Sequence, residues 1–372
     1  MIYFDNAATT ALDPEVIERM YGVMKNTFGN PSSVHAYGVQ ARALIDECRE
    51  KVASLLHVSP SEIFFTSCGT EAINMVIAGC CNDLNIHRII TSPLEHHAVM
   101  HACEHEVKLG RCKVELVKPD NKGNINIEEL ENIVKNGERA LVCLMHANNE
   151  IGNLLSIAEV GEICRKYNAY FLCDTVQSIG KFDHDFKENN IHFAACSAHK
   201  FHGPKGIGFL YLNGDIKISP LLQGGGQERN MRPGTENIYG IAGLAKAMEV
   251  AYRNLEADVA YIKSLKAYMV KRLKEVISDV GFNGESEENG LHTILNVSFP
   301  ETRKSDMLLY NLDIEGITAS GGSACTSGSV TESHVLKAIV ADLKRTAIRF
   351  SFSKFNTMDE VDKCIEVIKK VS

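Results

Sequence analysis

In the stretch AYFLCDTVQSIGK, residues 169–181, a short apolar run stops at an acid, Asp174. A run of this kind, bounded by polar residues, is typical of a strand that is buried on both faces of a sheet. ALVCLMHA (140–147) and GIGFLYL (206–212) have the same character, and EIFFTS and HRIITSP indicate further strands. Apolar residues at helical spacing lie between these runs, as in VQARALIDECREKVASLLHV and EAINMVIAGCCNDL.

Strands that alternate with helices predict an α/β fold with a mainly parallel sheet, covered by helices on both faces. After a long helical region from Ile241 to about Val280, the strand-like segments HTILNVSF, GITAS and AIRFSF predict a smaller α+β domain. The chain has 372 residues, more than a single core usually supports. We expect a large domain over residues 15–255 and a small domain from residues 1–14 and 256–372.

Composition limits the classes of function. The chain is 45% hydrophobic, and its net charge of −8 without a basic tract gives no sign of a nucleic-acid partner. No apolar run is long enough for a membrane helix, and the N-terminus MIYFDNAATTALDPEV lacks the pattern of a secretory signal. The 12 cysteines are irregularly spaced, many lie in apolar segments, and no CxxC pair occurs. We therefore expect a cytoplasmic protein with mostly buried free thiols and no zinc ribbon.

A lysine and an acid stand at positions where they could act together. Asp174 follows an apolar strand, and ligands of open α/β sheets bind beyond the carboxyl ends of strands. Lys200 follows the small-residue segment AACSAH, where burial would favour its neutral, nucleophilic form, whereas Lys205 in GPKG is expected in a solvated turn. Pyridoxal phosphate uses such a lysine together with a carboxylate at its ring nitrogen. Taken alone, the two residues also fit an exposed lysine and a helix cap.

The segment TSCGTEAINM (66–75) predicts the start of a helix directly after a strand. Gly69 supplies a tight turn, and Thr70 opens the helix, whose first N–H groups favour a phosphate. Ser197 and His199 lie beside Lys200 and could add donors. A helix cap with an acidic first turn explains the same residues without any ligand.

The segment SGGSACTSGS (320–329) places a thiol, Cys325, in a stretch too small and polar to build a core. Glycine permits large backbone excursions, and little burial favours a mobile segment. The thiolate is the reactive form of cysteine, so Cys325 is a candidate nucleophile. A passive loop thiol is the alternative.

A row of histidines opens another possibility. EHHAVMHACEHEV places His97, His101 and His105 at helical spacing, with Cys103 and Glu104 nearby. Histidines four residues apart can bind zinc, so a metal-binding protein is one alternative function. The HExxH pattern is absent, and a solvated helix face explains the row equally well.

Taken together, these segments resemble the cysteine desulfurases of the NifS/IscS type, a branch of the class V, fold-type I pyridoxal phosphate enzymes. The resemblance runs nearly end to end, in the order YFDNAATTALDPEV, FGNPSSVHAYG, FTSCGTEAIN, EHHAV, HANNEIG, CDTVQSIGK, SAHKFHGPKGIG, GGGQERNMRPGTEN, SGGSACTSGS and AIRFSF. It implies a fold-type I PLP-dependent transferase, in which the large domain holds a seven-stranded, mainly parallel sheet. It also implies the conversion of L-cysteine to L-alanine, with the sulfur left on the enzyme as a persulfide.

The resemblance assigns roles to the candidate residues. Lys200 binds pyridoxal 5'-phosphate covalently and moves the Cα proton, and Asp174 pairs with the ring nitrogen. Gln177 hydrogen-bonds the phenolic oxygen of the ring, and His96 stacks on the ring and transfers protons. The residues expected to hold the phosphate are Gly69, Thr70, Ser197, His199 and, from the partner subunit of a homodimer, Thr235.

The remaining roles concern the substrate and the sulfur. Asn148 and Arg349 are implied to hold the carboxylate of L-cysteine, and Cys325 to accept its sulfur. In AIRFSF, Arg349 alternates with apolar neighbours and should point away from them, and its planar fork suits a carboxylate. The expected acceptor of the sulfur is a protein, either a scaffold for iron–sulfur clusters or a thiolation carrier.

Some features leave alternatives open. Cys68 stands where the family commonly has glycine, and the chain stops soon after DEVDKCIEVIKKVS, which leaves docking to a scaffold protein in doubt. Selenocysteine lyase and cysteine sulfinate desulfinase are related functions with the same core residues. A non-catalytic sulfur-relay protein is a further alternative, although Lys200, Asp174, Gln177 and Arg349 are all present.

Overall fold

The computed structural model describes residues 1–301, 307–321 and 333–371. Its largest element is a seven-stranded sheet with mainly parallel strands, as predicted. In spatial order the strands are β2 (Ile63–Thr66), β8 (Gly208–Leu212), β7 (Phe193–Ser197), β6 (Tyr170–Asp174), β5 (Leu141–Met145), β3 (Arg88–Thr91) and β4 (Lys113–Leu116). Only β8 runs antiparallel to its neighbours β2 and β7.

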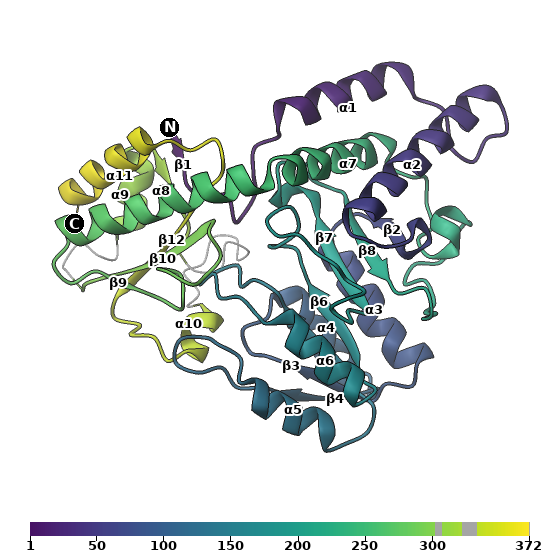
Figure 1. Ribbon diagram of the computed structural model, residues 1–372, viewed down its shortest axis with the longest axis horizontal. Coiled ribbons are helices and arrows are strands. Elements are labelled where there is room, and N and C mark those ends of the chain that lie inside the picture. The colour runs from purple at the N-terminus through teal and green to yellow at the C-terminus, as the bar shows by residue number, and fades with distance from the viewer. Residues whose placement is uncertain (302–306, 322–332, 372) are drawn as a thin grey trace.

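Helices cover both faces of this sheet (Figure 1). Alternate residues of each strand belong to two cores; in β6, Phe171 and Cys173 face one side, and Tyr170 and Leu172 face the other. The first core is closed by α2 (Ala36–Leu55), α5 (Ile127–Lys135), α6 (Ile157–Lys166) and α7 (Ile238–Arg253), and the second by α3 (Gly69–Asp83) and α4 (His97–Lys108). The apolar runs of the sequence are thus strands buried on both faces.

The helical region after Ile241 is two helices, not one. The helix α7 ends at Arg253, and α8 (Leu255–Val276) begins directly after Asn254, whose φ of −109° and ψ of 9° interrupt the helical geometry. In Figure 1, α1 (Pro14–Asn26) lies beside α7, while α8 runs from the large sheet to the second part of the molecule. Asp13 caps α1 by accepting a hydrogen bond from the N–H of Glu15, and Pro14 occupies the first helical position.

The second part of the molecule has its own core. It contains a three-stranded sheet in the order β12-β10-β9 and a parallel pair of β1 with β11. The strands are β9 (Gly281–Phe282), β10 (Ile294–Phe299), β12 (Thr346–Ser351), β1 (Ile2–Tyr3) and β11 (Ile317–Thr318), and the helices are α9 (Leu308–Ile314), α10 (His334–Ala338) and α11 (Met358–Val371). Phe4 is fully buried among residues that follow position 261, so the N-terminus belongs to this core. The division at residues 14 and 255 stays a prediction.

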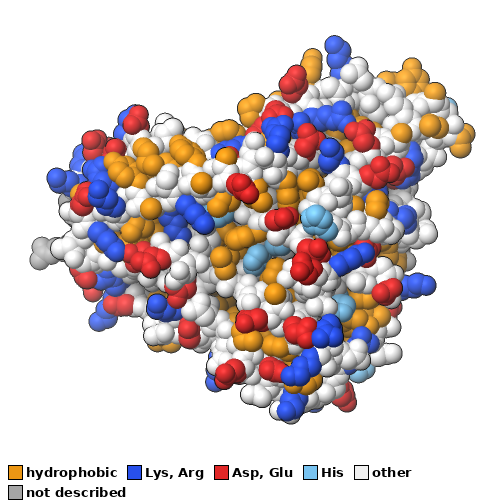
Figure 2. Space-filling view, in the orientation of Figure 1, with side chains coloured by type: hydrophobic (Ala, Val, Ile, Leu, Met, Phe, Trp, Pro, Cys, Tyr) orange, Lys and Arg blue, Asp and Glu red, His pale blue; other side chains and the backbone are white. Residues whose placement is uncertain are grey.

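The distribution of surface charge and the burial of the cysteines agree with what the composition predicts. On the visible face, Lys and Arg side chains are interspersed with Asp and Glu (Figure 2). The cysteines among the described residues are all free, and all of them except Cys68 are buried. Within the part of the chain that the structure describes, no helix has the length and apolar character to cross a membrane.

Candidate active site

Three neighbouring parallel strands end at one edge of the sheet, and the residues at these ends form the candidate active site. Asp174 is the last residue of β6, Ser197 is the last residue of β7, and Lys200 closes the short turn η2 (Ala198–Lys200). Strand pairing places Asp174 beside Met145 of β5 and Ala195 of β7. The predicted strand-end positions therefore converge at the edge where open α/β sheets bind ligands.

Asp174 is a buried acid suited to a cationic ligand atom. Its Oδ1 accepts a hydrogen bond of 2.9 Å from the N–H of Val176, and the residue is 6% exposed. Burial raises the pKa of Asp174 to about 6, and the Val176 hydrogen bond and the charge of Lys200 only partly oppose it. A positive group placed against this carboxylate would restore the stability of its ionised form.

Lys200 lies at the strand edge, half-buried, against the N-terminal segment. Its Nζ donates to the carbonyl oxygens of Ala7 at 2.7 Å and Ala8 at 2.9 Å. The same segment is held by Thr10, whose backbone N–H and hydroxyl both donate to the carbonyl of His199. Lys205 is exposed, as the sequence predicts.

The start of α3 lies next to Ser197. The N–H of Gly69 donates to Ser197 Oγ at 2.8 Å, and a Cβ at Gly69 would approach Val176 Cγ2 to 2.5 Å, so only glycine fits here. Thr70 is exposed at the first turn of this 15-residue helix. His199 contacts Thr9 Oγ1 through Nδ1 at 3.2 Å. Burial, assisted by Lys200, lowers the pKa of His199 to about 4, so its ring is neutral at pH 7.

His96 and Gln177 approach the same edge from two loops. His96 is the N-cap of α4, and its Nδ1 accepts a hydrogen bond of 3.1 Å from the N–H of Ala98. Burial, followed by the charge of Lys200, lowers the pKa of His96 to about 4; the neutral ring then carries its proton on Nε2. Gln177 donates from Nε2 to the Ala7 carbonyl at 2.9 Å, the same oxygen that Lys200 uses.

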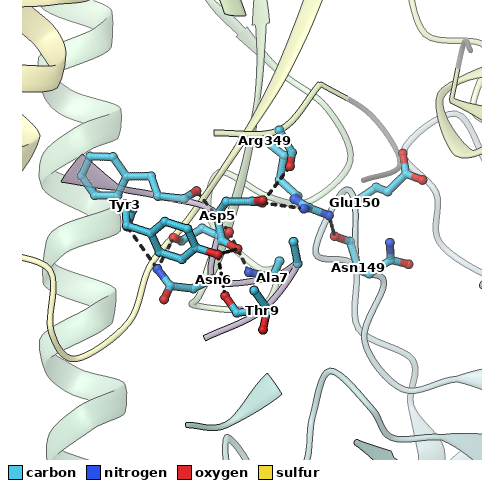
Figure 3. Close-up of polar contacts among 12 residues, drawn as sticks. Tyr3, Asp5, Asn6, Ala7, Thr9, Asn149, Glu150 and Arg349 are labelled. Carbon is cyan, nitrogen blue, oxygen red and sulfur yellow. Dashed lines mark hydrogen bonds and ion pairs between the residues drawn. The ribbon is translucent and has the colours of Figure 1, made fainter. Parts of the chain in front are cut away.

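Arg349 is buried, not exposed. It lies in β12 at 1% exposure and donates from Nη2 to Asp5 Oδ1 at 2.9 Å and from Nη1 to the Asn149 carbonyl at 2.7 Å (Figure 3). Asp5 Oδ1 also accepts from Ser320 Oγ at 2.7 Å. Among the described residues, Arg349 Nε has no hydrogen-bond partner, so the guanidinium keeps a donor for a carboxylate.

The side chain of Asn148 is engaged by the backbone. Its Oδ1 accepts from the N–H groups of Glu150 and Ile151, at 2.9 and 3.0 Å, and its Nδ2 donates to the carbonyl of Leu94 at 3.0 Å. The neighbouring Asn149 is less buried and touches Arg349 through its carbonyl. The substrate role of Asn148 therefore stays a prediction, with Asn149 as its nearest competitor.

Two predicted residues lie outside this group. Thr235 is exposed, and within the described ranges it makes no hydrogen bond to the other site residues. Cys325 lies outside the described residues, in the segment 322–332. The described residues on either side of that segment are anchored at the site: Ser320 exchanges two backbone hydrogen bonds with Arg349, and His334 contacts the carbonyl of Glu95 through Nε2 at 3.0 Å.

The row of histidines does not form a metal centre. The ring centroids of His97 and His101 lie 5.0 Å apart, and those of His97 and His334 lie 4.7 Å apart. Across residues 1–301, 307–321 and 333–371, no group of three or more His, Cys, Asp or Glu side chains is placed to hold a metal ion. The row packs beside the site and gives the metal-binding alternative no support.

Sequence reasoning missed the second residue of two important pairs. Asp5, the partner of Arg349, lies 344 residues away in the chain. Lys181 contacts Gln177 but carries no signal beyond the motif CDTVQSIGK. The motif YFDNAATTALDPEV, which is part of the resemblance, is the signal that could have pointed to Asp5 and Ala7.

Comparisons with known proteins agree with this geometry. Residues 2–364 match the family described as aminotransferase class-V. The chain is 39% identical over 374 residues to the cysteine desulfurase IscS of Dictyoglomus turgidum, which covers 100% of this chain and 94% of that protein. It is 40% identical over 375 residues to the cysteine desulfurase IscS of Methanosarcina thermophila, which covers 100% and 91%.

Solved structures give the same result. A NifS-like protein superimposes with a TM-score of 0.92 at 38% identity and covers 100% of this chain and 98% of its own. A structure described as SspA in complex with cysteine superimposes with a TM-score of 0.83 at 30% identity and covers 96% and 100%.

Proposed function

This chain belongs to the class-V aminotransferase family, and from that premise we propose that it is a cysteine desulfurase, which converts L-cysteine to L-alanine and takes the sulfur as a persulfide. The resemblance to the NifS/IscS type is confirmed by the relatives. Their names favour cysteine over selenocysteine and cysteine sulfinate as the substrate. The observation that carries the proposal is the convergence of Lys200 and Asp174 at one sheet edge. Ser320 and His334, the described residues that border the segment with Cys325, are hydrogen-bonded to Arg349 and to the Glu95 carbonyl.

The residues present fit pyridoxal 5'-phosphate as the cofactor. Asp174 is a buried carboxylate without a cationic side chain bonded to it among the described residues, and it suits a protonated ring nitrogen. The N-terminus of α3, with Gly69 held by Ser197 and Thr70 exposed beside it, offers backbone N–H groups to a phosphate. His199 is the further candidate for this group. When bound, the cofactor supplies an electron sink that allows the Cβ–S bond of cysteine to break.

The side chains of this chain supply binding and proton transfer. Lys200 would hold the cofactor through its Nζ, and the same amine would take the Cα proton of the substrate. Arg349 binds the substrate carboxylate through its remaining donor capacity, assisted by Asn148 or its neighbour Asn149. His96, neutral with its proton on Nε2, can donate a hydrogen bond from Nε2, while its Nδ1 is held by the N–H of Ala98.

Cys325 receives the sulfur. A bond forms between the Cys325 Sγ and the substrate sulfur as the Cβ–S bond of the substrate breaks, and the carbon fragment gains a proton and leaves as L-alanine. The persulfide sulfur then passes to an acceptor protein, either a scaffold for iron–sulfur clusters or a thiolation carrier. The free thiols of the described residues support a reducing compartment such as the cytoplasm.

The active unit is proposed to be a homodimer. Apolar side chains of α1, α2 and the segment between them stay exposed, among them Ile17, Phe28, Val34 and Tyr37 at 52%, 64%, 97% and 56%. This part projects from the molecule with a cluster of hydrophobic side chains at its end (Figure 2). Burial of such a surface by a second copy would remove apolar area from water. Thr235, exposed in one copy, would then be available to the phosphate site of the other.

The test of the function uses purified protein with L-cysteine, pyridoxal 5'-phosphate and a reductant. We expect alanine and sulfide in equal amounts, with selenocysteine and cysteine sulfinate as parallel substrates. Borohydride reduction should fix the cofactor on Lys200, and Cys325→Ala should bind substrate but release no sulfide. Cofactor attachment at Lys205, or unchanged sulfide release by Cys325→Ala, would contradict the assignment. Sedimentation at several concentrations tests the dimer.

A further inference from the structure

A second lysine, Lys181, lies near Lys200 and has no role in the steps above. Its Nζ donates to the backbone carbonyl of Gln177 at 2.8 Å and to Gln177 Oε1 at 3.2 Å. The two residues are four positions apart in the turn that follows β6. Lys181 also lines a small cavity that it shares with Lys200, His202 and His292.

The turn is built to bring Lys181 back to Gln177. Gly180 has a φ of +74°, in the left-handed region that favours glycine. A Cβ at this position would also approach the Cβ atoms of Phe201 and Ala251 to 3.1 and 3.2 Å. Backbone conformation and packing therefore both require glycine directly before the lysine.

Lys181 and Ala7 together leave the amide of Gln177 one orientation. A glutamine amide has an oxygen that only accepts and an NH₂ group that only donates. The Ala7 carbonyl only accepts, so it needs the NH₂ group, and Lys181 donates to the oxygen. A rotated amide would place two oxygens together at Ala7 and NH₂ against the amine of Lys181, which leaves buried polar groups unpaired.

We propose that Lys181 is a positioning residue that fixes the amide of Gln177, with its NH₂ group toward Ala7 and Lys200. The proposal rests on the proposed function, because the value of this orientation lies in presenting a donor to the phenolic oxygen of pyridoxal 5'-phosphate. Without Lys181 only the Ala7 carbonyl holds the amide, so the rotated orientation, which presents an acceptor to an oxygen that needs a donor, becomes more populated. Lys181 itself touches neither substrate nor cofactor in this account.

The matched control is a second lysine whose amine donates to a backbone carbonyl. Lys266 on α8 is 4% exposed and donates from Nζ to the Leu291 carbonyl at 3.1 Å, far in sequence from Gln177. Burial lowers the pKa of both lysines, to about 7 for Lys181 and about 8 for Lys266. Replacement of either by Met removes a buried amine of the same length, so the difference between the variants isolates the contact with Gln177.

The experiment measures the dissociation constant of pyridoxal 5'-phosphate from the cofactor-free protein, together with the visible absorption band of the bound cofactor. We expect Lys181→Met to raise this constant about 10-fold and to move the band, because the hydrogen bond that orients the Gln177 amide is lost. Lys266→Met should stay within about twofold. Gln177→Ala should raise the constant as well, and the double variant should match Gln177→Ala alone, because Lys181 acts through that amide.

Each outcome has one meaning. Additive effects of Lys181→Met and Gln177→Ala, or equal affinity of Lys181→Met and the wild type, overturn the inference while the wild type still binds the cofactor. A wild type that fails to bind the cofactor overturns the proposed function first. If Lys181→Met does not fold, Lys181→Gln takes its place. Because this variant keeps an N–H donor for Gln177, we expect a dissociation constant between those of the wild type and Gln177→Ala. Lys181→Ala cannot reach Gln177, so wild-type affinity and a wild-type band in that variant would overturn the inference.

Discussion

The sheet edge that carries Asp174, Ser197 and Lys200 and the region around Arg349 serve the same site but are held in different ways. On the sheet edge, Asp174 and Ser197 accept hydrogen bonds from the N–H groups of Val176 and Gly69, next to the strand ends, and only Lys200 reaches to the N-terminal segment, where it donates to the carbonyls of Ala7 and Ala8. Around Arg349, the guanidinium from β12 depends on Asp5 from the N-terminus and on the loop after β5.

The difference concerns what fixes each geometry. Parallel strands place the residues at their ends side by side whatever those residues are, so the cofactor region inherits its geometry from the sheet. The region around Arg349 exists only after three distant segments have come together. We therefore expect changes on the sheet edge to alter chemistry with the fold intact, and changes near Arg349 to act on substrate binding.

The largest effect is expected for Asp174→Asn. Asparagine keeps the acceptor for the Val176 N–H but removes the negative charge that would face the ring nitrogen. Loss of a preorganised electrostatic partner costs on the order of 100-fold or more in kcat. Steady-state release of alanine measures it, with Asp185→Asn as control, because Asp185 also accepts from nearby backbone N–H groups but lies away from the strand end. A kcat within threefold of wild type would show that Asp174 has no such role.

The same variant should make the cofactor-free protein more stable. The pKa of Asp174 is about 6 in the fold against an ordinary value of 3.8, so the folded state binds its proton more tightly than the unfolded chain does. The free energy of unfolding is therefore reduced by the ionisation of Asp174 in the fold. This reduction is absent below about pH 4, grows as the pH rises toward 6, and reaches up to about 3 kcal/mol at pH 7. Urea unfolding of cofactor-free Asp174→Asn should thus show a higher free energy of unfolding at pH 7 and none of this gain at pH 3.5.

A control of opposite sign separates this effect from a general loss of charge. Asp120 accepts hydrogen bonds from the N–H groups of Lys122 and Asn124, and these bonds hold its pKa below the ordinary value despite some burial. Asp120→Asn should lower stability at pH 7, where the charged form is favoured in the fold. Two variants that shift stability in the same direction would mean that Asp174 is not destabilised by burial.

On the other side of the comparison, Arg349→Lys should act on substrate binding. Lysine cannot reproduce the planar fork of arginine, and a lost charge-assisted hydrogen bond is worth about 1.5–3 kcal/mol, or roughly 10- to 100-fold in KM for L-cysteine. The control is Arg345→Lys, since Arg345 donates to Ser298 and Asp279 at a more exposed position. A KM that rises equally in both variants would point to a structural role for Arg349.

The same contrast explains what the sequence could predict. The parallel sheet, its buried strands and the positions of Asp174 and Lys200 follow from apolar runs that end in polar residues, a pattern read within about ten neighbouring positions. The pairing of Asp5 with Arg349 spans 344 residues and leaves no local pattern. For that reason the sequence predicted that Arg349 points away from its apolar neighbours but not that it is fully buried.

The sequence also could not show which of two adjacent residues in one motif contacts the substrate. In HANNEIG both asparagines fit a turn, and a resemblance assigns a role without showing which side chain the backbone has already engaged. The break between α7 and α8 at Asn254 was not predicted either, because the helical pattern continues through this residue.

The smallest expected effect comes from Asn149→Ala, compared with Asn148→Ala. Asn148 accepts from two buried backbone N–H groups, so its loss should cost about 1–3 kcal/mol of the free energy of unfolding. Asn149 lies beside Arg349 through its carbonyl, which alanine keeps, so Asn149→Ala should leave stability unchanged. If the Asn149 amide meets the substrate carboxylate, KM for L-cysteine rises about threefold to tenfold, as for one lost hydrogen bond. If instead Asn148→Ala raises KM at a temperature where it is fully folded, and Asn149→Ala does not, then the Asn148 amide meets the substrate carboxylate, and the side chain that fixes the backbone of this loop also binds the substrate.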